Sequence, residues 1–314
     1  MYYPSGETDK QLNARRVELE ALIVETLRRH PSLCYFQGYH DIVQVFLLVQ
    51  GVGPASPLVQ RLSMLRIRDF MLPKLSASVS HLQLLPVILY KADREIYDIL
   101  PANPFYGLAH VLTLYSHDIH SYKDIARLFD FLLAREAVMT IYLFAVIVIS
   151  KREQLLEYMA DGPDEDVMSV VLQKLPENID IEDMIAKASA LFEQYPPQSL
   201  PFRTWAKVSD TSVLKTTMDV KALAIQTLEE GQILFEKHAE QIRRDEARQR
   251  MLLTVKKTLS KYQRPVVLTI SVAICVIAIL VGKDKNTTIG ATLQRLFNVS
   301  NLGRFVGFTG GREL

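Results

Sequence analysis

The chain has 314 residues, of which 49% are hydrophobic and 9% aromatic, so it can bury a substantial core in one large or two modest domains. A formal net charge of +1 lacks the basic excess that dedicated nucleic-acid-binding proteins usually carry, and no nucleic-acid partner is expected. Two cysteines, Cys34 and Cys275, and seven histidines without a His-x-x-x-His or HExxH pattern predict neither a disulfide framework nor a metal site.

Helical periodicity runs through almost the whole chain. Between residues 9 and 30, apolar side chains recur at helical spacing and Pro31 follows the end. Further helical stretches are expected, in chain order, at 42–50, 57–71, 80–99, 104–115, 123–133, 137–154, 165–175 and 181–194. No alternating strand runs joined by hairpin dipeptides occur, so the sequence predicts an all-α domain over residues 1–205.

Residues 206–264 differ in composition, being rich in Lys, Arg, Glu and Gln, and predict a charged helical linker. Residues 265–282 follow with no charge in eighteen positions, close to the lower limit for crossing a hydrocarbon layer of about 30 Å. We expect a transmembrane helix here, and the alternative is a hydrophobic helix inside a soluble domain. The flanking basic residues are Lys256, Lys257, Lys261, Arg264, Lys283 and Lys285.

The basic excess before this segment favours a cytosolic location for the preceding domain and contact with anionic membrane lipid. Asp245 and Glu246 interrupt the basic run, and an ordinary charged helix is the alternative for lipid contact. Residues 283–314 would then form a short tail on the far side of the membrane. The sequon at Asn298 is a candidate glycosylation site there, and it would report the topology.

A polar segment between two expected core helices is the most informative motif. Residues 35–42 read Tyr-Phe-Gln-Gly-Tyr-His-Asp-Ile. Gly38 permits an unusual dihedral or a close backbone approach, and the amide of Gln37 can both donate and accept hydrogen bonds. This combination suits the orientation of a water molecule against a phosphate better than acid–base chemistry. The alternative is a simple turn between two core helices.

Further motifs follow in a fixed order: 68–71 (Arg-Asp-Phe-Met), 82–90, 127–134, 141–149 and 192–197 (Phe-Glu-Gln-Tyr-Pro-Pro). With the glutamine motif and the C-terminal apolar segment, they resemble TBC-domain GTPase-activating proteins for Rab GTPases. The resemblance covers roughly residues 19–200. It is strongest to the member-20-like branch, which is anchored in the endoplasmic reticulum membrane and implies that location here, with the N-terminal domain cytosolic and residues 283–314 lumenal.

The resemblance implies that Gln37 enters the nucleotide site of an early-secretory Rab and positions the attacking water. Tyr35, Gly38, Tyr39, His40 and Asp41 would support the loop or contact the partner. For Tyr35 and Tyr39 a place in the core is the alternative, and His40 could pair with Asp41. The chain would need no cofactor of its own, because it would act on the GTP and Mg²⁺ bound to the Rab.

The family also carries an arginine finger in an IxxDxxR motif upstream of the glutamine. No such motif precedes Gln37 here, and Arg15, Arg16, Arg28 and Arg29 are expected to be solvated helix charges. We therefore expect an N-terminally truncated TBC domain with impaired activity, because an arginine finger contributes about 10³–10⁵ in rate. The alternatives are a non-catalytic, membrane-tethered Rab-binding scaffold and an unrelated helical membrane protein.

Overall fold

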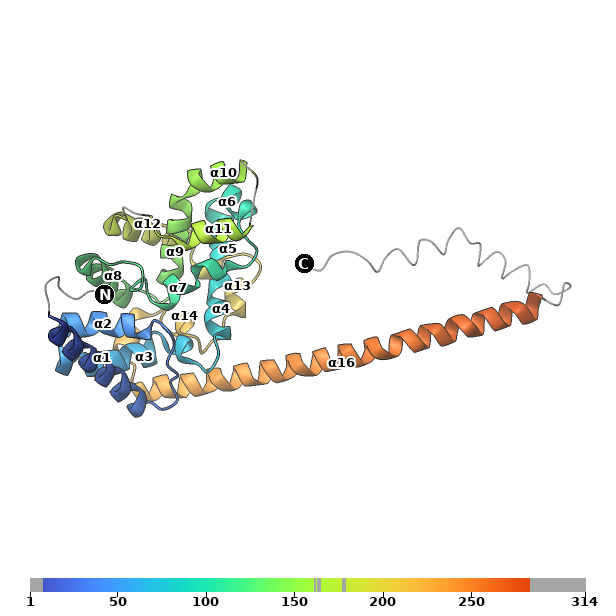
Figure 1. Ribbon diagram of the computed structural model, residues 1–314, viewed down its shortest axis with the longest axis horizontal. Helices are drawn as coiled ribbons and strands as arrows, with labels where there is room; N and C mark the ends of the chain where they lie inside the picture. Colours follow the sequence, from blue (N-terminus) through green and yellow to red (C-terminus); the bar gives the residue numbers. More distant parts are fainter. Residues whose placement is uncertain (1–7, 161, 163–164, 177–178, 283–314) are drawn as a thin grey trace. The chain divides into compact units, whose positions relative to one another are not determined.

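The computed structural model describes residues 8–160, 162, 165–176 and 179–282, with the backbone alone for 165–167 and 258–282. The described residues contain helices and no strand, which confirms the predicted all-α class (Figure 1). The α-helices are α1 (Asp9–Arg29), α2 (Tyr39–Gln50), α3 (Val52–Leu65), α4 (Ser76–Leu82), α5 (Leu84–Ala92), α6 (Arg94–Ile99), α7 (Leu108–Leu112), α8 (Tyr122–Ala134), α9 (Met139–Ser150), α10 (Arg152–Ala160), α11 (Glu165–Gln173), α12 (Ile181–Gln194), α13 (Thr204–Lys207), α14 (Val213–Thr216), α15 (Val220–Ile225) and α16 (Leu228–Gly282). Short 3-10 helices are η1 (Arg68–Met71), η2 (Pro104–Gly107) and η3 (Pro197–Ser199).

Helix α9 is the centre of the hydrophobic core. Every residue from Met139 to Val148 is buried, because nearly all of them are apolar and the helix has no polar face to turn to water. Helices α5, α7, α10 and α12 pack against it, and Figure 1 shows α9 between α5 and α12. The most apolar part of the predicted TBC domain is therefore a core helix. With 12 residues, it is also too short to cross a membrane.

The chain forms two compact units, 1–242 and 243–314, so the first unit extends beyond the boundary expected at 205. The region predicted as a linker from residue 206 thus contributes the end of α13, all of α14 and α15, and the start of α16 to the first unit. Some of its apolar side chains pack into the core, while others, such as Ile225 and Ile233, are exposed. Those buried in the core are Val208, Val213, Leu214, Leu223 and Phe235.

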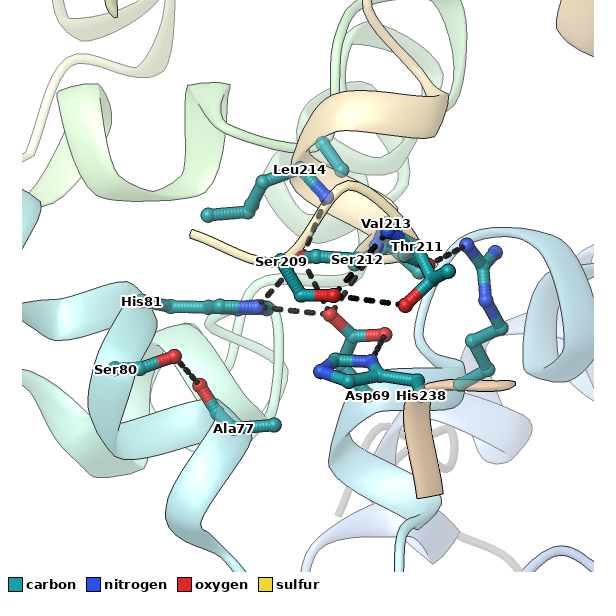
Figure 2. Close-up of polar contacts among 12 residues, drawn as sticks. Asp69, Ala77, Ser80, His81, Ser209, Thr211, Ser212, Val213, Leu214 and His238 are labelled. Atoms are coloured by element: carbon teal, nitrogen blue, oxygen red, sulfur yellow. Dashed lines mark hydrogen bonds and ion pairs between the residues drawn. The ribbon is translucent and has the colours of Figure 1, made fainter. Parts of the chain in front are cut away.

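A buried carboxylate fastens this segment to the rest of the first unit (Figure 2). Asp69 in η1 is fully buried, and its Oδ2 accepts hydrogen bonds from His81 Nε2 (2.9 Å), Ser212 Oγ (2.6 Å) and Val213 N (3.1 Å). Its Oδ1 lies 3.3 Å from Nδ1 of His238 in α16. Burial alone would raise the pKa of Asp69, but the hydrogen bonds and charges of His238 and His81 hold it well below its usual range.

Arg68 ties down the same segment from the neighbouring position. Its Nη2 donates to the carbonyl oxygen of Thr211 (2.6 Å), just before α14, and to Oγ1 of Thr216 (2.7 Å), the last residue of α14. Burial lowers the pKa of this guanidinium, and the charge of Asp69 opposes the shift. Arg68 is thus a structural side chain inside the domain and faces no partner.

Asp69, His81 and Ser212 have the residue types of a nucleophilic triad, but their geometry excludes that role. Nε2 of His81 contacts both the carboxylate and the serine hydroxyl, so the imidazole does not relay a proton between them. All three residues are buried. The cluster therefore serves folding.

Among the residues whose side chains are described, no helix is both long and apolar enough to span a membrane. The predicted transmembrane segment, 265–282, falls outside that set, since only its helical backbone within α16 is described. The tail 283–314, with Asn298, also lies outside the described residues.

Candidate functional site: the glutamine loop

Residues 30–38, here called the glutamine loop, connect α1 to α2 and carry Gln37 on the surface. The backbone N–H of Cys34 donates to the carbonyl oxygen of Met71 (2.8 Å), which ties the loop to the end of η1. Leu33 and Phe36 are buried, and the ring of Phe36 packs on that of Phe70 with centroids 6.2 Å apart. These contacts hold the backbone of the loop on the core, and Gln37 is exposed between them and α2.

Gly38 joins the loop to α2 in a conformation that requires glycine. Its φ is +100°, in the left-handed region, and it occupies the N-cap position of α2. A Cβ atom at this position would lie 2.6 Å from Cγ2 of Thr113, far closer than van der Waals contact. Gly38 therefore sets the direction in which the chain leaves Gln37 and enters the helix.

Replacing Gly38 by alanine is expected to lower the free energy of unfolding by about 1–3 kcal/mol, from the positive φ and the clash with Thr113. Urea denaturation measures the change. Gly53→Ala is the matched control, because a Cβ there meets no atom within 4 Å, and we expect little effect. Adding Thr113→Ser to Gly38→Ala should recover part of the loss, since it removes the methyl group that clashes. Equal effects at the two glycines would contradict this account.

The side chains on either side of Gln37 form a chain of polar contacts. The hydroxyl of Tyr35 lies 2.9 Å from Nδ1 of His40, and Nε2 of His40 lies 3.5 Å from Oδ1 of Asp41. Oδ2 of Asp41 is 3.2 Å from Nδ1 of His117, which comes from the loop after α7. Burial, followed by the charge of Asp41, raises the pKa of Tyr35, so the phenol stays protonated and can donate.

Tyr35 and Tyr39 have different environments, although both flank the glutamine. Tyr39 is fully buried, its hydroxyl lies 2.7 Å from Oγ of Ser63, and burial raises its pKa to about 12. Tyr39 is therefore a core residue. Tyr35 is 50% exposed and presents its ring at the surface beside Gln37, where a partner can reach it.

All six residues singled out in the sequence thus meet in one place, with Gln37 and Tyr35 exposed, His40 and Asp41 partly exposed, and Gly38 and Tyr39 buried. Two contributors were not predicted, Thr113 and His117, which lie on a loop far along the chain. Only an observed contact, or covariation between the two segments, could have revealed them.

The four arginines considered ahead of the glutamine all lie in α1. Arg16 donates to Asn13 (3.3 Å) and Arg29 pairs with Glu25 (3.0 Å), both within the helix. Arg28 is exposed in the last turn. In the described part of the chain, no group of His, Cys, Asp and Glu side chains is arranged to hold a metal ion.

Comparison with known proteins identifies the family. The sequence profile of the Rab-GTPase-TBC domain matches residues 3–156, which contain the whole glutamine loop and its supports. The mouse protein TBC1 domain family member 20 is 31% identical over 287 residues, spanning 90% of this chain and 70% of the relative. The chain belongs to the Rab-GTPase-TBC domain family.

Other relatives agree with this assignment. The human TBC1 domain family member 20 is 30% identical over 288 residues, with 90% of this chain and 70% of the relative covered. The GTPase-activating protein gyp10 of Schizosaccharomyces pombe is 32% identical over 211 residues, 66% of this chain. The alignment spans little more than half of gyp10, 56% of its length. In the present chain the TBC profile ends within α10, whereas the first compact unit extends to Ile242.

Proposed function

We propose that this TBC domain accelerates the hydrolysis of GTP bound to a Rab GTPase, with Gln37 as the residue that positions the attacking water. The observation that carries the proposal is the exposed amide of Gln37 on a loop that is held to the core by Leu33, Phe36 and the backbone of Cys34. Membership of the family, and relatives named as GTPase-activating proteins, support it.

The role proposed for Gln37 is to position the attacking water molecule. Phosphoryl transfer requires an aligned nucleophile and stabilisation of charge on the phosphoryl oxygens, with little covalent participation by the protein. A glutamine amide can accept a hydrogen bond from the water through its oxygen and donate one through its nitrogen. The GTP and Mg²⁺ are those of the Rab, and the TBC domain supplies no cofactor.

The second catalytic group of the family is an arginine, and its usual pattern is absent ahead of Gln37 in this sequence. We propose that residues 1–314 on their own stimulate hydrolysis weakly, because the charge of the transferring phosphoryl group lacks a stabiliser that contributes about 10³–10⁵ in rate. A second candidate is a tethered scaffold that binds a Rab without stimulating it.

The proposal includes a membrane location. An uncharged segment at 265–282, preceded by exposed basic residues at Arg248, Arg250, Lys256 and Lys257, favours an anchor in the endoplasmic reticulum membrane with the TBC domain in the cytosol. Contact of the basic residues with anionic lipid would add to the attachment. An early-secretory Rab is then the expected partner, and glycosylation of Asn298 would report this topology.

Single-turnover GTP hydrolysis by an early-secretory Rab, with the purified 314-residue chain in excess, tests the proposal. We expect a rate above the intrinsic rate of the Rab and well below that given by a TBC domain with both fingers. Binding without any rate increase would favour the scaffold. A rate equal to that of a two-finger domain would contradict the proposed impairment.

A further inference from the structure

The loop that follows α7, residues 113–121, lies against Gly38 of the glutamine loop and against Asp41 in the first turn of α2, although it is remote from both in the sequence. Cγ2 of Thr113 occupies the space that a side chain at Gly38 would need. Nδ1 of His117 lies 3.2 Å from Oδ2 of Asp41 in the first turn of α2. We call residues 113–121 the support loop.

The backbone of the support loop is held in a conformation that it would not adopt unaided. Leu114 and Tyr115 have φ values of 50° and 66°, in the left-handed region that costs a non-glycine residue roughly 1–2 kcal/mol. Such strain persists only where surrounding contacts fix it, and it occurs often at functional sites. Here it turns the chain back so that His117 faces α2.

Several contacts lock this turn. The hydroxyl of Tyr115 donates to the carbonyl oxygen of Thr140 in α9 (2.6 Å), and its backbone N–H donates to the carbonyl oxygen of His110 (2.9 Å). Nδ1 of His110 lies 2.7 Å from Oδ2 of Asp118, the neighbour of His117. The support loop is thus attached directly to the core helix, so His117 extends from a rigid base.

The proton positions around Asp41 follow from the donors available. A carboxylate can only accept, so His117 donates from Nδ1 to Oδ2. On the other side, the hydroxyl of Tyr35 lies 2.9 Å from Nδ1 of His40, and Nε2 of His40 lies 3.5 Å from Oδ1, a longer polar contact. Asp41 is therefore contacted by two histidines, His40 in its own helix turn and His117 in the support loop. Of these, only His117 connects the start of α2 to a different part of the fold.

We propose that His117 is a positioning residue for Gln37, a role that rests on the function proposed above. By holding Asp41 it fixes the first turn of α2, and through Gly38 it fixes the direction in which Gln37 projects. His117 itself is not a catalytic residue in this proposal. Its side chain is 66% exposed, so its removal should not unfold the domain.

The test compares three variants of the full chain in single-turnover Rab hydrolysis, measured across a range of chain concentrations. His117→Ala should lower the maximal rate about three- to tenfold and leave the half-saturating concentration within about twofold, since misplacement acts on the chemical step. His117→Asn should restore most of the rate, because its amide nitrogen occupies the position of Nδ1 and can donate to Asp41. His120→Ala is the control, an exposed histidine in the same loop with no hydrogen bond seen among the described residues.

An unchanged maximal rate in His117→Ala would overturn the proposal. A raised half-saturating concentration with an unchanged maximal rate would also overturn it, because His117 would then contact the Rab directly. Failure of His117→Asn to restore the rate would have the same consequence.

A second measurement does not need catalysis. Hydrogen exchange of the amides of residues 39–42 should be at least about threefold faster in His117→Ala than in the unmodified chain, and equal rates would overturn the proposal. Failure of the proposed function would look different. The unmodified chain would then give no stimulation at all, while the exchange rates could still respond to His117→Ala.

Discussion

Gln37→Ala should return GTP hydrolysis by the bound Rab to its intrinsic rate while leaving the affinity for the Rab nearly unchanged. Misplacing one reacting group by about 1 Å can already cost on the order of 10² in rate, and removal of the amide takes away the group proposed to orient the water. The side chain of Gln37 is exposed and makes no buried contact, so the loop should keep its shape without it. Single-turnover kinetics with excess chain measure the rate, and titration measures binding.

The matched control for this variant is Gln50→Ala, an exposed glutamine at the other end of α2. It should leave both rate and affinity unchanged. Stimulation that survives in Gln37→Ala would show that another group orients the water. A parallel loss of binding would mean that Gln37 contributes contact energy and not water placement.

Asp69→Ala should lower the free energy of unfolding by about 3–5 kcal/mol, the range seen when one partner of a buried charged network is removed. The variant leaves donors on His81, Ser212 and His238 without their acceptor inside the core. Urea unfolding followed by the fluorescence of Trp205, the single tryptophan, measures the change.

Asp98→Ala is the control for this change, because Asp98 makes an exposed ion pair with Arg94 and should contribute less than about 1 kcal/mol. The double variant Asp69→Ala/His238→Ala should lose less free energy of unfolding than the sum of the losses in the two single variants, since the residues share one network. Because the pKa of Asp69 is lowered in the folded protein, its stabilisation is present above its ordinary value of 3.8 and is lost as the pH falls below it. Equal losses at Asp69 and Asp98 would refute a fastening role for the buried carboxylate.

The all-α class and the position of the glutamine loop could be predicted because they depend on local patterns. Helical periodicity spans the chain, and Gly38 with its neighbours forms one continuous motif. The contributions of Thr113 and His117 could not be predicted, because they depend on how a later loop folds back. The strained turn at Leu114 and Tyr115 has no glycine to mark it in the sequence.

The TBC domain is predicted from the sequence to end at 205, whereas the first compact unit of the structure extends to Ile242. In the early part of α16, Leu228, Phe235 and Ile242 pack on the core at intervals of seven residues, and the many charged residues between them are typical of a solvated helix. The decisive contacts are polar and buried, from His238 to Asp69 and from Arg68 to α14. Charged and histidine residues are usually expected at the surface, and only the fold shows that Arg68, Asp69 and His238 are buried.

The most direct test of the proposed role of Gln37 is whether the chain binds the Rab more tightly in the transition state of GTP hydrolysis. The Rab, loaded with GDP and Mg²⁺, is passed over the immobilised chain with and without aluminium fluoride, which mimics the phosphoryl group in transfer. A site complementary to the transition state should retain much more Rab when aluminium fluoride is present, and Gln37→Ala should remove the difference. Equal retention with and without aluminium fluoride, or an undiminished difference in Gln37→Ala, would contradict the claim that Gln37 acts in the nucleotide site.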